Sequence, residues 1–145
     1  GAVESTQGHL IARKMLEDAG IRLNDFKSHI FTGSHQGAVD AVLSGKADAG
    51  AAQDMLVERM SKDGKVKIIA VSEEFPSSGI AVNKKVDAEI VEKVKDALFS
   101  FDPARKHKNI HPEWKKTEMA SGFIESQYND YDRIESLALR YGIIK

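Results

Sequence analysis

Apolar residues recur every three or four positions in several stretches of the chain, the spacing of an amphipathic helix. The first stretch ends at Gly20 and contains four such positions, Leu10, Ile11, Met15 and Leu16. We therefore predict a helix over about residues 8–19. The same spacing predicts four further helices, which cover residues 38–43, 54–60, 90–101 and 131–141. Asp54 and Asp87 are placed to cap two of them.

Short runs rich in β-branched or small apolar residues lie between the predicted helices, and their composition predicts strands. The clearest is Val66-Lys67-Ile68-Ile69-Ala70-Val71. The others are residues 28–32, 47–52 and 80–82. Because strands and helices alternate along the chain, the sequence predicts an α/β fold with a mostly parallel sheet flanked by helices and a helical C-terminal part.

Charge and cysteine content narrow the classes of function. The 145 residues include 21 Lys and Arg against 22 Asp and Glu, and this balance gives no electrostatic footprint for nucleic acid. The absence of cysteine excludes a disulfide framework and a thiolate nucleophile. No apolar run approaches the roughly 20 residues that span a bilayer. The first residues, Gly1-Ala2-Val3, also lack the features of a signal peptide.

A histidine pair raises the question of a metal site, because His107 and His111 are four residues apart. Pro112 follows the second histidine, and no carboxylate completes a zinc motif. The pair also lies among basic residues that repel cations, namely Arg105, Lys106, Lys108, Lys115 and Lys116. We therefore predict no metal and no other cofactor.

Two loops that precede helices are candidates for anion binding. The turn Ser5-Thr6-Gln7-Gly8 opens the first predicted helix, where backbone N–H groups and the helix dipole favour negative charge. His35 lies in the second loop, where an imidazole N–H can donate to an oxyanion. Ser5 or Thr6 as an ordinary helix cap, and His35 as a surface histidine, are the alternatives.

Polar residues further along the chain extend this candidate site. Asp48, Gln53 and Asp54 lie at or just after the short predicted strand at 47–52, so their side chains could reach the carboxyl edge of the sheet, where open α/β sheets bind ligands. Asp54 is equally placed to be a helix cap. Ser77 and Ser78 lie in a turn after Pro76 and offer hydroxyl donors, although this is also ordinary turn chemistry.

Evidence for catalysis is weaker than evidence for binding. The chain contains no nucleophile elbow, no phosphate-binding loop of the GxxxxGK[ST] type and no dinucleotide fingerprint. Glu4, Ser5, His9 and His35 can be drawn as a catalytic group, but closeness in sequence is no evidence of catalytic geometry. We therefore expect a protein that is not an enzyme.

Three sequence segments, taken together and in order, indicate a protein family more specifically than any one of them does alone. Glu-Ser-Thr-Gln-Gly-His-Leu covers residues 4–10, Phe-Thr-Gly-Ser-His-Gln-Gly-Ala covers 31–38, and Val-Leu-Ser-Gly-Lys-Ala-Asp-Ala-Gly-Ala covers 42–51. Together they resemble the phosphate/phosphonate-type substrate-binding proteins of ABC transporters. The resemblance extends over nearly all of the chain.

This resemblance implies the type II fold of periplasmic binding proteins, in which two α/β lobes enclose a ligand cleft, and the chain is expected to form one such lobe. In the family, a Ser-Thr-Ser triplet at a helix N-terminus and a loop histidine hold the phosphonate oxygens. By position these correspond to Ser5, Thr6 and His35, with Gln7 in place of the third serine and Gly8 following it. Relatives that bind aminoalkyl phosphonates add acidic residues near the positions of Gln53 or Asp54 and of Ser78.

The resemblance also leads to expectations about organisation and partners. The chain begins where the family's second lobe begins, so residues 1–78 are expected to form that lobe. Residues 79–145 are expected to form a returning strand and C-terminal helices that complete the first lobe. The implied function is binding of phosphate, phosphite or a small phosphonate in the periplasm or another extracytoplasmic space, in partnership with a permease.

Two rival functions remain open. One is a stand-alone sensory or interaction lobe that self-associates as a homo-oligomer, because the missing lobe would leave apolar surface exposed. The other is a small enzyme with the same architecture, since fold alone does not decide function.

Overall fold

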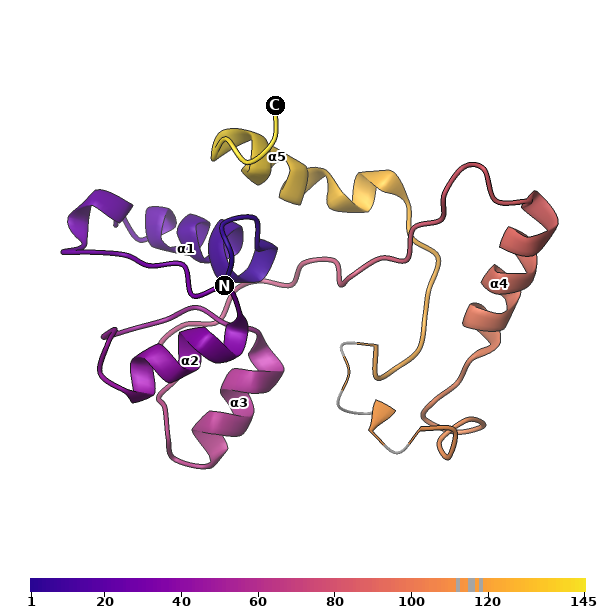
Figure 1. Ribbon diagram of the computed structural model, residues 1–145, viewed down its shortest axis with the longest axis horizontal. Helices are drawn as coiled ribbons and strands as arrows, with labels where there is room; N and C mark the ends of the chain where they lie inside the picture. The colour runs from indigo at the N-terminus through magenta and orange to yellow at the C-terminus, as the bar shows by residue number, and fades with distance from the viewer. Residues whose placement is uncertain (112, 115–116, 118) are drawn as a thin grey trace. The chain divides into compact units, whose positions relative to one another are not determined.

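The computed structural model describes residues 1–111, 113–114, 117 and 119–145, and its chain divides into two compact units. Unit 1 comprises Gly1–Glu74 and Asp132–Lys145, and unit 2 comprises Phe75–Tyr131. Figure 1 shows the helices in chain order. Three residues named above in the discussion of the histidine pair, Pro112, Lys115 and Lys116, lie outside the described residues.

Unit 1 begins with one continuous helical segment. A π-helical stretch, η1 (Thr6–Ile11), leads directly into α1 (Ala12–Asp18). The other helices of this unit are η2 (Leu23–Asp25), α2 (His35–Leu43), α3 (Asp54–Lys62) and α5 (Asp132–Arg140). The last of these, drawn in yellow in Figure 1, packs on η1, and α2 packs on α3.

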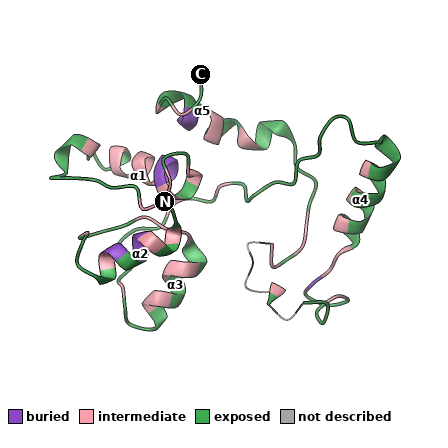
Figure 2. Ribbon diagram, in the orientation of Figure 1, coloured by how far each residue is buried: buried purple, intermediate pink, exposed green. Residues whose placement is uncertain are grey.

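A small apolar core lies between η1 and α5, and α2 carries further buried apolar side chains. The buried hydrophobic residues come from η1, α2 and α5, as Figure 2 shows, and they are Leu10, Ile11, Ala38, Val39, Ala41, Leu137 and Ala138. Burying the η1 and α5 side chains against one another is the main force that holds α5 to the first helix, whereas the α2 residues belong to the helix that packs on α3. The core therefore joins segments from the beginning and the end of the described chain.

Unit 2 has one long helix and an aromatic cluster. The helix α4 (Ala88–Ser100) begins at Asp87, whose side chain accepts a hydrogen bond from the Glu89 N–H. Phe101 contacts His107, Trp114 and Phe123 at ring-centroid distances of 5.4, 4.8 and 6.5 Å. The Phe101–His107 pair is stacked and the Phe101–Trp114 pair is edge-on, two arrangements by which aromatic rings stabilise a small unit.

The remainder of unit 2 is mostly turns. Residues 103–109 form consecutive turns, although we predicted a largely helical C-terminal part. A short 3-10 helix, η4 (Tyr128–Tyr131), ends the unit. Its Tyr131 hydroxyl donates a hydrogen bond to the Ser77 carbonyl at 3.0 Å.

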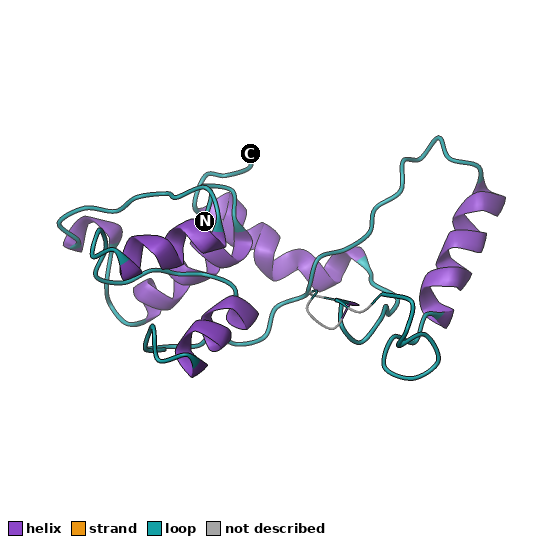
Figure 3. Ribbon diagram, turned by 60° about the horizontal axis from the view of Figure 1, so that its bottom comes forward, coloured by secondary structure: helices purple, strands orange, loops and turns teal. Residues whose placement is uncertain are grey.

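The predicted sheet is wrong. No residue of the described part of the chain belongs to a strand, and the segments between helices in Figure 3 are loops. The run at 65–71 forms no helix and has no ladder partner, and Ile69 and Val71 are 78% and 75% exposed. A β-branched run becomes a strand only when a neighbouring strand supplies hydrogen bonds and packing.

The predicted helices, by contrast, are confirmed, with their ends shifted by a few residues. Gly20, Gly45 and Gly142 follow the last turns of α1, α2 and α5 with φ of 78°, 71° and 69°. At the end of α1 the Ile21 N–H reaches the Leu16 carbonyl at 2.8 Å, which satisfies an orphan carbonyl of the last turn. Glycine is favoured after each helix because the left-handed conformation strains residues with a Cβ.

Candidate functional site

The predicted turn at residues 5–8 forms the N-terminus of the first helical segment. Ser5 is its N-cap, and the Ser5 Oγ accepts a hydrogen bond from the Gly8 N–H at 2.9 Å. Because the oxygen only accepts in this bond, the hydroxyl proton stays available to donate elsewhere. Thr6 and Gln7 occupy the first turn, where backbone N–H groups point out of the helix. The turn therefore presents donors and no acidic side chain of its own.

Gly8 packs against Gly1 without room for a side chain. A Cβ on Gly8 would lie 2.8 Å from the Gly1 Cα and 2.9 Å from the Ser5 Oγ. On its other side, Gly1 accepts a hydrogen bond at its carbonyl from the Gly33 N–H at 3.2 Å. Gly1 thus joins the Ser5–Gly8 turn to the loop before α2.

That second loop forms the same kind of cap as the first. The Ser34 Oγ accepts a hydrogen bond from the Gly37 N–H at 2.9 Å, and the Thr32 hydroxyl donates to the Ser34 carbonyl at 3.0 Å. Two serine-capped helix N-termini are therefore held next to a single residue, Gly1. Both ends favour negative charge, because the positive ends of the helix dipoles lie there.

His35 is the first residue of α2, and its tautomer is fixed by a neighbour from α3. The His35 Nδ1 accepts a hydrogen bond from the Gln53 N–H at 3.2 Å. A ring nitrogen that accepts carries no proton, so the neutral ring is protonated on Nε2. The half-buried His35 therefore presents an Nε2–H donor, as anion binding requires.

Two other predicted site residues, Gln53 and Asp54, lie at the start of α3, and the backbone of Gln53 contacts His35. Gln53 is the N-cap of α3, and Asp54 is its first helical residue, so the prediction that Asp54 is the N-cap is wrong by one position. The Asp54 Oδ1 accepts a hydrogen bond from the Met55 N–H at 2.7 Å. Asp54 is exposed and satisfies the first turn of its own helix.

Ser78 differs from the other predicted site residues because it belongs to unit 2, where it is exposed. The structure therefore brings the two N-terminal turns together in unit 1 and connects one of them to Gln53 through His35.

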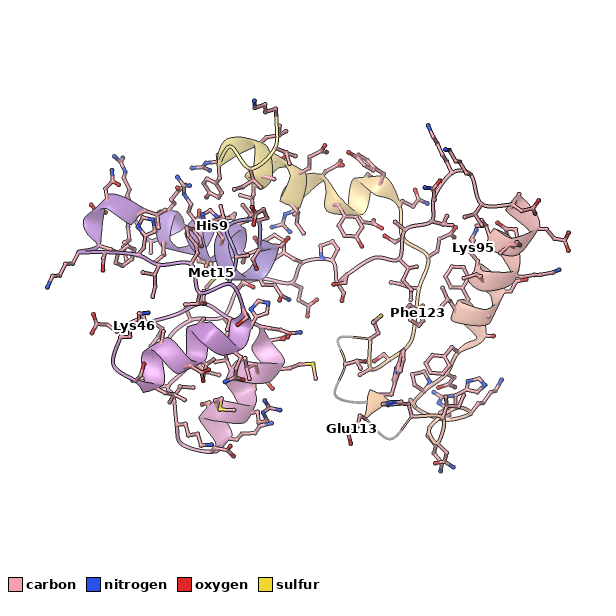
Figure 4. All side chains as sticks on the ribbon, viewed as in Figure 1. His9, Met15, Lys46, Lys95, Glu113 and Phe123 are labelled. Atoms are coloured by element: carbon pink, nitrogen blue, oxygen red, sulfur yellow. The ribbon has the colours of Figure 1, made fainter. Side chains whose placement is uncertain are left out.

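His9 is a buried residue of this region that sequence reasoning did not include among the binding residues; it is labelled on η1 in Figure 4. The His9 Nδ1 lies 2.6 Å from the Val3 carbonyl oxygen. Its ring meets Phe31 edge-on at 4.8 Å and stacks on Tyr141 at 6.3 Å. The sequence signal that could have identified it is its position directly before the apolar pair Leu10-Ile11, because this position lies on the buried side of the helix.

A charged cluster surrounds Tyr141 on the outer side of this contact. Glu17 accepts hydrogen bonds from Arg140 at 2.7 Å and from the Tyr141 hydroxyl at 3.1 Å, while Arg13 lies 4.1 Å from the Tyr141 ring centroid. Desolvation by burial, followed by the hydrogen bond to Glu17 and its charge, raises the pKa of Tyr141 above its usual value. These contacts hold Arg140 and Tyr141 against α1.

The remaining features of the described structure do not form a second candidate binding site. A hollow of about 340 Å³ lies along α3, but it is open and contains none of the predicted residues. No group of three or more His, Asp or Glu side chains that could hold a metal occurs among the described residues. In the same part of the chain, no helix has the length and apolar character needed to cross a bilayer.

Comparison with known families identifies the class of protein. The family model described as "ABC transporter, phosphonate, periplasmic substrate-binding protein" matches residues 1–131. This match covers most of the chain, which therefore belongs to that family of periplasmic substrate-binding components. Such proteins deliver small ligands to permeases and are not enzymes.

Proposed function

We propose that this chain binds the oxyanion head of phosphate, phosphite or a small phosphonate for an ABC transporter. Ser5, Thr6 and Gln7 contribute hydroxyl, amide and backbone donors, and Gly8, which has no room for a side chain, lets this turn pack against Gly1. His35 contributes its Nε2–H. The observation that carries the proposal is the pair of serine-capped helix N-termini joined through Gly1.

The same residues support a preference among phosphonates. Ser78 has no charge to pair with a ligand amine, and the Asp54 carboxylate already accepts a bond from its own helix. Gln7 is larger than serine, so it favours a compact head group. We therefore propose that neutral ligands such as methylphosphonate bind better than aminoalkyl phosphonates.

We further propose that residues 1–78 act as the oxyanion-binding lobe of a bilobal protein and that residues from 79 onward contribute to the other lobe, except for Asp132–Lys145, which belong to unit 1. The matched N-terminal turns all lie in unit 1, which supports the first part of this assignment. In such an arrangement the second lobe closes over the ligand and excludes water, which strengthens each charged hydrogen bond.

Calorimetry on the whole chain tests the binding proposal. We expect phosphate, phosphite and methylphosphonate to bind with millimolar affinity, because the donors are half-buried or exposed and compete with water. Acetate at equal ionic strength is the control for nonspecific charge effects. Absence of saturable heat with all three ligands at high millimolar concentration would refute the proposal.

A second candidate function, self-association, is favoured by one observation. The run at 65–71 exposes Ile69 and Val71, and contiguous exposed apolar residues mark interaction surfaces. If this chain acts as an interaction lobe, light scattering will show stable dimers whose mass is unaffected by phosphate. A monomer across the concentration range contradicts this alternative.

A further inference from the structure

His9 makes one hydrogen bond that no hydrocarbon side chain can make. The residue is only 7% exposed, and its Nδ1 lies 2.6 Å from the Val3 carbonyl oxygen. Because a carbonyl oxygen only accepts, the Nδ1 must carry the ring proton. The other ring nitrogen, Nε2, is buried and has no hydrogen-bond partner among the described residues.

A residue selected only to fill this core would be apolar. Burying an unpaired ring nitrogen lowers stability, and phenylalanine has nearly the same shape without that cost. The contribution that is particular to histidine here is therefore the Nδ1–H bond to Val3. This bond connects the second turn of the first helical segment to the residue two positions before the Ser5 cap.

The ring also contacts the second anion-binding loop and the end of the chain. Phe31 meets it edge-on at 4.8 Å, and Phe31 directly precedes Thr32, whose hydroxyl donates to the Ser34 carbonyl. Tyr141 stacks on the ring at 6.3 Å with 24° between the planes. One buried ring thus touches the segments that lead to both serine caps.

We propose that His9 is a positioning residue for the oxyanion site, an inference that rests on the function proposed above. Its Nδ1–H holds the Val3–Glu4 backbone so that Ser5 keeps its extended conformation (φ −69°, ψ 121°) with Oγ on the Gly8 N–H. With the cap held in place, the Ser5 hydroxyl proton and the first-turn N–H groups face the ligand before it arrives. His9 itself does not touch the ligand.

Two substitutions separate the hydrogen bond from the packing. His9→Phe keeps an aromatic ring between Phe31 and Tyr141 but removes the donor to Val3. His9→Asn keeps a short N–H donor near the Nδ1 position but removes the ring. A matched control is His29→Phe, because the exposed His29 also meets Phe31 edge-on, at 5.9 Å, and makes no contact with Val3 in the described hydrogen bonds.

The readouts are urea unfolding and calorimetric binding of methylphosphonate. We expect His9→Phe to unfold at the same urea concentration as wild type, or a higher one, yet to bind about fivefold to tenfold more weakly. His9→Asn will be less stable but will bind within about twofold of wild type where it is folded. His29→Phe will match wild type in both measurements.

Nitrogen-15 NMR of the wild-type chain gives a readout that simple packing does not alter. We expect His9 to carry its proton on Nδ1 and His35 to carry its proton on Nε2, two opposite tautomers in one spectrum. A proton on Nε2 of His9 overturns the inference whether or not the variants fold.

The outcomes also distinguish the inference from the function on which it rests. If wild type binds no phosphate or methylphosphonate, the proposed function is refuted, and the positioning role is refuted with it. If wild type binds and His9→Phe binds equally well, only the positioning role is refuted. Weak binding by His9→Phe together with near-normal binding by His9→Asn supports it.

Discussion

Replacing Ser5 by alanine gives the sharpest test of the oxyanion turn, because Ser34 provides a matched control. Both serines cap a helix, and each Oγ accepts from a glycine N–H three residues ahead at 2.9 Å. In the proposal the Ser5 hydroxyl donates to the ligand, whereas the Ser34 hydroxyl only caps the helix that begins with His35. Any difference between Ser5→Ala and Ser34→Ala in binding therefore reports on ligand contact rather than on capping.

The expected magnitudes follow from the two roles of the Ser5 hydroxyl. Loss of an N-cap costs about 1 kcal/mol, so both variants should lose about that much free energy of unfolding. A hydroxyl that donates to a charged oxygen contributes about 2 kcal/mol, so Ser5→Ala should weaken methylphosphonate binding about 30-fold. Ser34→Ala should weaken it by less than about threefold, through its effect on the loop alone.

Urea unfolding followed by circular dichroism measures the stability term, and calorimetry at a temperature where each variant is folded measures the affinity. Chemical-shift changes of the Gly8 and Gly37 amides on titration with methylphosphonate give a local check on where the ligand lies. Equal losses of affinity in the two variants would show that capping alone is responsible. Wild-type affinity in Ser5→Ala would refute the role of the hydroxyl.

Three further predictions concern other parts of the site and its surroundings. His35→Ala removes the Nε2–H donor and the acceptor of the Gln53 N–H, so calorimetry should show roughly 10-fold weaker binding of phosphate; unchanged affinity would place the ligand elsewhere. Calorimetry should also show that 2-aminoethylphosphonate binds no more tightly than methylphosphonate, because Ser78 carries no charge; tighter binding would contradict the assigned preference. Burial and Glu17 raise the pKa of Tyr141, so the folded chain holds the phenol proton more strongly than the unfolded chain. That stabilisation is complete below about pH 10 and is lost as the pH rises through the folded-state pKa. In urea unfolding at rising alkaline pH, the free energy of unfolding should therefore decline less for Tyr141→Phe than for wild type. Parallel declines would show that the phenol does not contribute.

Local signals predicted the helices well. Apolar residues at helical spacing, Asp87 before α4 and the glycines after α1, α2 and α5 act within one or two turns of chain, so a sequence displays them directly. The Ser5 cap was predictable for the same reason. The error at the start of α3 is one residue, because Gln53 and Asp54 both suit a helix N-terminus.

The sheet was not predictable in this way, because a strand depends on partners that its own sequence does not name. The run at 65–71 has the composition of a strand but pairs with no other strand among the described residues. The contacts that complete the candidate site are likewise distant in sequence. His35 meets Gln53 from 18 residues away, and His9 meets Tyr141 only through the packing of α5 on η1.

The packing of α5 on η1 has a consequence for how the chain acquires its structure. Leu10 and Ile11 share their core with Leu137 and Ala138, and Glu17 pairs with Arg140, 123 residues later. During synthesis the first helix therefore emerges long before its last partners exist, and closing so long a loop is entropically slow. Unit 1 can therefore complete its core only after α5 has been synthesised.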